Sequence, residues 1–115
     1  MAARFSNSLT AMAFSDNLKQ LTNVSNLASL QLIDGQGAVV ATIENKPGQA
    51  GSLAVYASLA DASGVITAEG ASRGLDIYAE HTVDARANPG KHPNIDRLIS
   101  LIAQGGQWTV KLLPA

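Results

Sequence analysis

Two runs of alternating apolar residues around a tight turn are the strongest structural signal in this sequence. Leu30 and Leu32 fall on one face of the first run, and Val39 and Ile43 fall on one face of the second. The residues between the runs, 34–37, read Asp-Gly-Gln-Gly, which is typical of a hairpin turn. The pattern therefore predicts a β-hairpin over residues 28–44. Because an isolated hairpin is only marginally stable in water, further elements must join and cover it.

A third strand is predicted at the C-terminal end of the chain. Trp108, Val110 and Leu112 alternate there with two polar residues, and Pro114 ends the pattern. We expect Trp108 to lie in the core, since no basic groove accompanies it as in a base-stacking surface. This strand should join the hairpin in one sheet.

The remaining periodic segments have helical spacing. We predict a short, weak helix over residues 15–21 and longer helices over 53–61, 67–87 and 94–104. The β-rich triplet at 53–55 leaves a strand as the alternative for that segment. Each predicted helix is preceded by a side chain suited to capping its N-terminus, and these side chains are Ser15, Ser52, Thr67 and Asn94.

Two glycines interrupt the longest predicted helix. Gly70 and Gly74 each cost a helix about 1 kcal/mol relative to alanine. We interpret them as positions where another backbone, that of the preceding helix, approaches closely.

These elements predict an α+β fold. We expect a two-layer sandwich in which about three mainly antiparallel strands, the hairpin and the C-terminal strand, are covered by three to four helices. The opposite face of the sheet would carry aliphatic residues such as Ile33 and Val40. An aliphatic surface of this kind makes a homodimer formed through the sheet a further hypothesis.

The length of the chain fits one domain. With 115 residues it can enclose one core of moderate depth. We assign residues 1–13 to a flexible N-terminal tail and residues 14–115 to a single α+β domain. The Arg, Ser and Ala content of the tail also fits a mitochondrial-type transit peptide, which is the less favoured alternative.

The composition excludes several classes of function. The formal net charge is −1 and the basic residues are scattered, so nucleic acid is not an expected partner. There is no cysteine, which excludes disulfides and thiolate metal sites and suits a reducing compartment, so we expect a cytoplasmic location. No run of about 18 apolar residues is present, so no membrane partner is expected either.

Several short motifs of the sequence resemble a family of small uncharacterised bacterial proteins, a domain of unknown function. The motifs are ENKPG at 44–48, GSLAVY at 51–56, AEHT at 79–82, DAR at 84–86 and NPGKHPNID at 88–96. The similarity extends from about Phe14 to Leu113. The resemblance implies a single domain, and it supplies no activity, cofactor or site residue.

Both histidines of the chain fall in one polar stretch, residues 80–97. The Asn-Pro-Gly sequence at 88–90 predicts a turn that folds the chain back after a helix. The candidate binding residues in this stretch are Glu80, His81, Asp84, Arg86, Lys91, His92 and Asp96. The alternative interpretation is a solvated acidic helix face with histidines at helix ends. Arg86 would then need an acidic partner, Asp96 or Glu44, and we favour Asp96 as a structural contact.

Two kinds of chemistry are open to these residues. Glu80, His81 and Asp84 lie on one helical turn, and with His92 they could bind a divalent metal, although their spacing matches no established ligand motif. The same groups could instead perform acid-base chemistry, with a histidine carrying the proton and a carboxylate orienting it.

Two functional hypotheses follow from the sequence. The first is a non-enzymatic cytosolic binding domain that contacts an unknown protein or small-molecule ligand through residues 80–96, with no cofactor expected. The second is a small metal- or acid-base-dependent enzyme built on Glu80, His81, Asp84 and His92.

Overall fold

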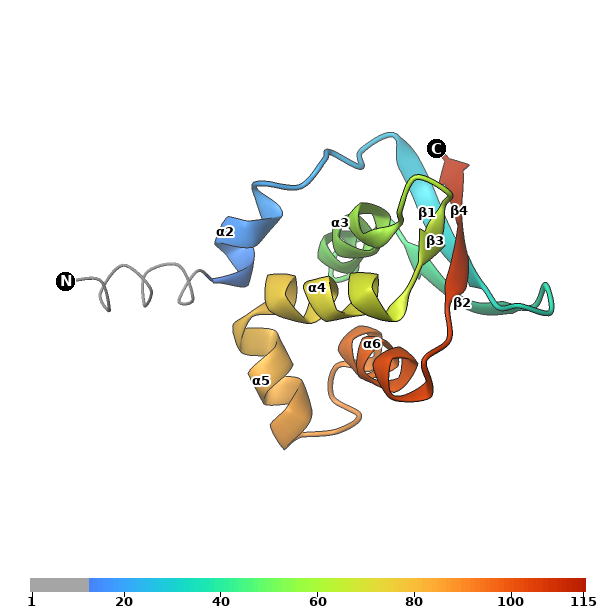
Figure 1. The fold of residues 1–115 in the computed structure, drawn as a ribbon. Helices are drawn as coiled ribbons and strands as arrows, with labels where there is room; N and C mark the ends of the chain where they lie inside the picture. Colours follow the sequence, from blue (N-terminus) through green and yellow to red (C-terminus); the bar gives the residue numbers. More distant parts are fainter. Residues whose placement is uncertain (1–12) are drawn as a thin grey trace.

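A four-stranded sheet forms one layer of the protein (Figure 1). The structure, a computed structural model, describes residues 13–115, and the labels of Figure 1 are kept here. The strands are β1 (Leu27–Ile33), β2 (Val39–Glu44), β3 (Val65–Ile66) and β4 (Trp108–Pro114). Their order is β2-β1-β4-β3, and each neighbouring pair is antiparallel. The predicted hairpin and C-terminal strand are confirmed, whereas β3, with two residues, is too short to show a period in the sequence.

The two faces of the sheet differ in polarity. Leu30 lies opposite Ile43, and both side chains are buried against the helices. The next residue, Gln31, lies between Thr42 on β2 and Lys111 on β4. Because successive side chains of a strand point to opposite faces, this polar row lies on the face that the helices leave open.

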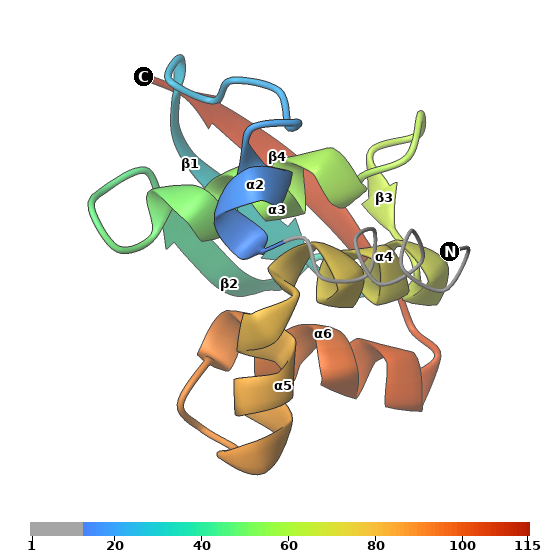
Figure 2. The ribbon, with the colours of Figure 1, turned by 90° about the vertical axis from the view of Figure 1, so that its left-hand side faces the viewer.

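The second layer is helical (Figures 1 and 2). Within residues 13–115 the helices are α2 (Phe14–Leu18), α3 (Ala50–Leu59), α4 (Ala68–Tyr78), α5 (Glu80–Ala87) and α6 (Pro93–Gln104). Figure 1 shows α3, α4 and α6 next to the sheet and α2 and α5 at the far side of the helical layer. The predicted α+β two-layer architecture is confirmed. None of these helices combines the length and the apolar content that crossing a bilayer requires.

The predicted N-terminal tail, residues 1–13, lies outside the described residues except for Ala13, which directly precedes α2.

One of the four predicted helix caps is confirmed. The hydroxyl oxygen of Thr67 accepts a hydrogen bond from the backbone N–H of Gly70 at 3.3 Å. The predicted caps Ser15, Ser52 and Asn94 are wrong, because α2, α3 and α6 each begin before those residues. A serine or asparagine near a helix start can serve a tertiary contact instead, and the sequence does not separate the two uses.

The single long helix predicted over residues 67–87 is wrong. The chain breaks at Ala79, whose φ is 51° and ψ is −115°, and α5 turns away from the axis of α4 (Figure 2). The hydroxyl of Thr82 donates a buried hydrogen bond of 2.6 Å to the carbonyl of Leu75 and closes the break. Alanine is the strongest helix former, so local propensity gives no sign of this break.

The helices approach one another most closely at the two glycines of α4. A Cβ atom on Gly74 would lie 2.7 Å from a methyl carbon of Leu59 and 2.8 Å from one of Leu98. A Cβ atom on Gly70 would lie 3.0 Å from the carbonyl oxygen of Leu59. The predicted close approach by the backbone of the preceding helix, α3, is therefore confirmed at Gly70, whereas Gly74 makes room for side chains of α3 and α6. Trp108 is partly buried and packs against the same core, as expected.

Candidate functional site

The turn between α5 and α6 is folded back by hydrogen bonds from both of its ends. The backbone N–H of Gly90 donates to the carboxylate of Asp96 at 2.8 Å, and that of Lys91 donates to the carbonyl of Asn88 at 3.1 Å. Gly90 has a φ of 94°, which other residues rarely adopt. Pro93 then starts α6, at the first helical position that proline favours. The turn therefore holds the residues on either side of it in fixed positions.

Asp84 is the hub of the polar contacts at this turn. Its Oδ2 lies 2.7 Å from Nε2 of His92 and 2.9 Å from Nζ of Lys91, and its Oδ1 accepts from Asn88 at 2.9 Å. The hydrogen bond from His92, and after it the one from Lys91, lower the pKa of the Asp84 carboxyl well below its usual range. With Asp84 ionised, Nε2 of His92 carries the donated proton, and the ring is oriented before any ligand arrives.

Four aromatic rings form a continuous row beside these polar contacts. Phe14 stacks on Tyr78 with ring centroids 5.2 Å apart and meets His81 edge-on at 5.1 Å. His81 in turn lies 5.7 Å from His92. The backbone N–H of Phe14 donates to the carboxylate of Glu80 at 2.8 Å. Glu80 therefore fixes the start of α2 against the row.

These rings border a pocket of about 270 Å³ that opens to solvent. We call it the histidine pocket, and it is lined by Phe14, Gly48, Ser52, Tyr78, His81, Lys91, His92 and residues 93–95. The hydroxyl of Tyr78 donates to that of Ser52 at 2.6 Å, and burial raises the pKa of Tyr78. The pocket thus combines two imidazoles, an ammonium group and a pair of hydroxyls on an aromatic wall.

Two of the helices that border the histidine pocket, α3 and α6, are tied together by hydrogen bonds. The hydroxyl of Tyr56 on α3 donates to the carbonyl of Asn94 in the first turn of α6. Arg97 donates to the side-chain oxygen of Asn94 at 2.7 Å and lies 3.5 Å from the Tyr56 hydroxyl. Because Tyr56 is fully buried, this link belongs to the core and holds the pocket walls at a fixed spacing.

The predicted site residues fall into three groups. His81, Lys91 and His92 line the histidine pocket, and Asp84 lies behind it. Glu80 and Arg86 line a different groove. The carboxylate of Asp96 is used by the turn, as the acceptor for Gly90. The expected ion pair between Arg86 and Asp96 is wrong, since no such pair occurs in residues 13–115.

Four lining residues of the histidine pocket were missed by sequence reasoning, namely Phe14, Gly48, Ser52 and Tyr78. The first three are far from residues 80–96 in the chain, whereas Tyr78 ends α4 two residues before that stretch. In the sequence, Tyr78 has the spacing of a core residue and Ser52 the position of a helix cap. Neither pattern indicates a residue that lines a pocket. No local pattern in the sequence marks them, because only the packing of the helices brings them together.

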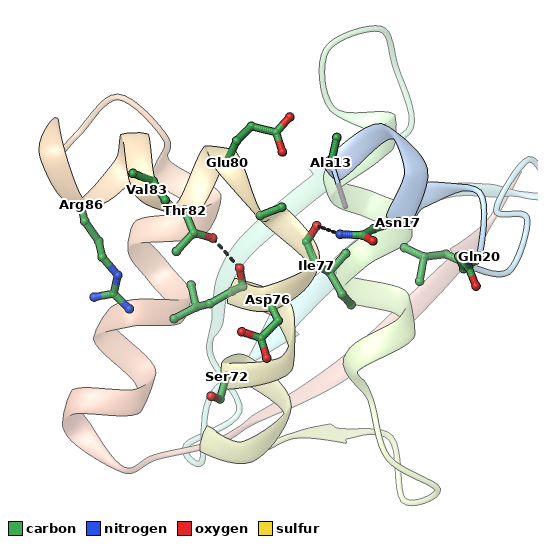
Figure 3. A pocket seen from close by; sticks show the side chains of 13 residues that line it. Ala13, Asn17, Gln20, Ser72, Asp76, Ile77, Glu80, Thr82, Val83 and Arg86 are labelled. Carbon is green, nitrogen blue, oxygen red and sulfur yellow. Dashed lines mark hydrogen bonds between the residues drawn. The ribbon is translucent and has the colours of Figure 1, made fainter. Parts of the chain in front are cut away.

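A larger, open groove of about 1260 Å³ runs between α2, α4 and α5 (Figure 3). Figure 3 shows Asn17 and Gln20 on one side and Val83 and Arg86 on the other. Ile77 lines this groove and is partly buried. We favour the histidine pocket as the candidate site because its polar groups converge, whereas those of the groove lie apart.

The described residues do not contain a metal-binding cluster. No group of three or more His, Cys, Asp or Glu side chains that could hold an ion occurs in residues 13–115. The carboxylates of Glu80 and Asp84 are bonded to Phe14 and to Lys91 and His92, respectively. The four residues considered for a metal therefore do not form a ligand set in this part of the chain.

Comparison with known proteins gives a family and no activity. A family model described as "Uncharacterized protein conserved in bacteria (DUF2322)" matches residues 14–112. No curated protein and no solved structure matches the chain. The matched range agrees with the extent expected from the short motifs of the sequence.

Proposed function

Since the chain belongs to this family of uncharacterised bacterial proteins, we propose that it is a binding domain that takes up a small ligand in the histidine pocket. One observation carries the proposal: His81, Lys91 and His92 converge with the Ser52 and Tyr78 hydroxyls on one pocket that is open to solvent. A pocket with a few convergent polar groups on an apolar wall is the usual form of a small-molecule site.

The pocket is also organised before a ligand enters. Asp84 holds Lys91 and His92, and the ring of Phe14 holds that of His81. Groups that are already fixed lose little conformational entropy on binding, which favours affinity. This order supports a ligand site in preference to a merely solvated helix face, whose side chains would have no need of such support.

A screen of small metabolites by ligand-observed NMR tests the proposal. We expect at least one compound to bind and to shift the backbone amides of Ser52, Lys91, His92, Asn94 and Ile95 in the labelled protein. Lys91→Ala should weaken that binding, whereas Lys111→Ala, an equal loss of charge on the open face of the sheet, should leave it unchanged. If the bound compounds shift only residues of the groove or of the sheet, the histidine pocket is not the site.

Acid-base catalysis is the second candidate, and the contact between Asp84 and His92 favours it. A carboxylate 2.7 Å from Nε2 holds the imidazole in one tautomer, which leaves Nδ1 of the neutral ring to accept a proton. The test follows from the screen: each ligand found is incubated with the protein in D₂O and followed by NMR. Conversion or deuterium uptake that His92→Gln abolishes would support an enzyme. A ligand that stays unchanged over days supports binding alone.

We further propose a cytoplasmic location and a homodimer formed through the sheet. The absence of cysteine from the sequence suits a reducing compartment. Val39 and Val40 on the edge strand β2 are 51% and 46% exposed, and pairing with a second copy would cover them. Cell fractionation tests the location, and a monomeric mass in analytical ultracentrifugation at high concentration would refute the dimer.

A further inference from the structure

Three basic side chains line the histidine pocket, namely His81, Lys91 and His92. None of the described residues that line the pocket has a carboxylate. The neighbouring carboxylates already have partners: Asp84 accepts from Lys91 and His92, and Glu80 accepts from the backbone of Phe14. Lys91 is 60% exposed and carries three donor hydrogens, so its ammonium can bind a ligand oxygen while it keeps Asp84.

The first turn of α6 adds to this preference for negative charge. Asn94 and Ile95 line the same pocket, next to the basic side chains. The N-terminal end of this 12-residue helix carries a partial positive charge, although Pro93 has no N–H and the amides of Ile95 and Asp96 already donate to the carbonyl of His92. Side chains and helix thus favour the same kind of group, an oxyanion.

The aromatic row sets the shape of the ligand. Phe14, Tyr78, His81 and His92 all contribute rings to the pocket wall. Ring walls of this kind favour planar groups that stack on them or meet them edge-on. The volume of about 270 Å³ lies below the range of roughly 300–1,000 Å³ that is typical of drug-sized ligands. It suits one ring with one charged substituent.

From these observations we propose that the histidine pocket binds a small oxyanion carried on a planar ring, namely an aromatic carboxylate or an aryl phosphate. This inference rests on the proposed function and names the ligand class for it. The oxyanion lies against Lys91 and the start of α6, with the imidazole of His81 as a further donor, and with that of His92 as one when both of its ring nitrogens are protonated. The planar ring packs on the aromatic wall.

Five commercial compounds test the oxyanion and the ring separately, in NMR titrations of the full-length labelled protein. Benzoate and phenyl phosphate carry both features, acetate and inorganic phosphate lack the ring, and benzamide lacks the charge. We expect benzoate or phenyl phosphate to bind at least about tenfold more tightly than its ring-free counterpart, acetate or inorganic phosphate. It should also bind at least about tenfold more tightly than benzamide, as a charge-assisted contact predicts. Benzoate and phenyl phosphate also decide which oxyanion the pocket takes.

Variants of Lys91 connect the binding to the site. Lys91→Ala should weaken the preferred probe about tenfold, since it removes a charge-assisted hydrogen bond. Lys91→Arg should restore most of the affinity, and Lys111→Ala should have no effect. Lys91 is largely exposed, so its loss leaves the fold intact, and thermal unfolding of each variant checks this.

Each contrary outcome has a distinct meaning. Equal binding of benzamide and benzoate would refute the oxyanion, and equal binding of inorganic and phenyl phosphate would refute the ring. If none of the five probes binds while the metabolite screen finds a ligand of this pocket, the ligand class is wrong and the binding function stands. If neither the probes nor the screen yields a ligand of the pocket, the proposed function itself fails.

Discussion

Nε2 of His92 lies 2.7 Å from Oδ2 of Asp84, and the same carboxylate oxygen lies 2.9 Å from Nζ of Lys91. One acidic residue on α5 thus positions two basic residues of the following turn. His92 is mostly covered, whereas Lys91 remains largely open to solvent. The contact therefore links the stability of the turn to the arrangement of the histidine pocket.

Asp84→Asn should lower stability in a pH-dependent way. The pKa of Asp84 is below its ordinary value of 3.8, first through His92 and then through Lys91. A depressed carboxyl pKa stabilises the folded state above the unfolded value, and this contribution is lost as pH falls through the folded value. The difference in unfolding free energy between wild type and variant, measured with urea, should be largest at neutral pH and should disappear in strong acid.

Asp16→Asn is a matched control for that experiment. Asp16 is also exposed, and its carboxylate lies 3.9 Å from Lys19, a longer contact than either one at Asp84. We expect it to have little effect on stability, as is usual for surface ion pairs. If the loss of unfolding free energy in Asp84→Asn persists unchanged into strong acid, the charge of Asp84 does not have the stabilising role given to it.

Ionisation of the tyrosines should be strongly delayed in the folded protein. Both tyrosines of the chain are buried, and desolvation raises the pKa of Tyr56 to about 12 from 10.0, although Arg97 partly opposes the shift. Burial raises the pKa of Tyr78 as well. A raised phenol pKa stabilises the fold fully below the unfolded value, and this contribution is lost as pH rises through the folded one.

Ultraviolet absorbance of the phenolate measures this delay. The folded protein should show little phenolate at pH 10, where the chain unfolded in concentrated urea is about half ionised. Tyr78→Phe, which leaves Tyr56 as the single reporter, should ionise with a midpoint near 12 or on alkaline unfolding. An ordinary midpoint in the folded protein would show that the Tyr56 hydroxyl is not buried.

Gly74→Ala should destabilise the protein although alanine favours helices. The added methyl would lie 2.7 and 2.8 Å from methyl carbons of Leu59 and Leu98 in the core. Overpacking of this kind outweighs the gain in helix propensity, and we expect a net loss of roughly 1–2 kcal/mol in urea unfolding. Gly35→Ala is the control, since a Cβ atom there meets nothing within 4 Å. A Gly74→Ala protein more stable than wild type would refute the close approach.

Ala79→Gly should stabilise the protein. Ala79 has a φ of 51° and a ψ of −115°, outside the regions that alanine prefers. Glycine adopts positive φ without steric cost, so relief of strain should add about 1 kcal/mol to the unfolding free energy. The same change at Ala103, an exposed residue of α6, should instead cost up to about 1 kcal/mol. A loss at both positions would mean that Ala79 carries no strain.

Much of the fold follows from patterns that are local in the sequence. The hairpin is predicted because alternation and turn chemistry agree over residues 28–44, and each is a property of neighbouring residues. Gly70 and Gly74 indicate helix contact because glycine is costly in a helix without such a reason. The break at Ala79 could not be predicted, since it depends on the buried contact between Thr82 and Leu75.

Only part of the candidate site could likewise be predicted from the sequence. His81, Asp84 and His92 stand close together in the sequence on either side of a turn, so their convergence could be expected. Ser52 joins them only through the packing of α3 against α4, where it meets the Tyr78 hydroxyl. Residues that meet through tertiary packing leave no period or spacing in the sequence.

The position of Gly74 has a consequence for selectivity. Side chains of Leu59 on α3 and Leu98 on α6 come together at this glycine, and those two helices also supply Ser52 and Asn94 to the pocket rim. The aperture of the pocket is therefore a property of the protein interior. Relatives with larger or smaller side chains at positions 59, 74 and 98 would bind ligands of different width, even if every residue at the pocket opening were the same.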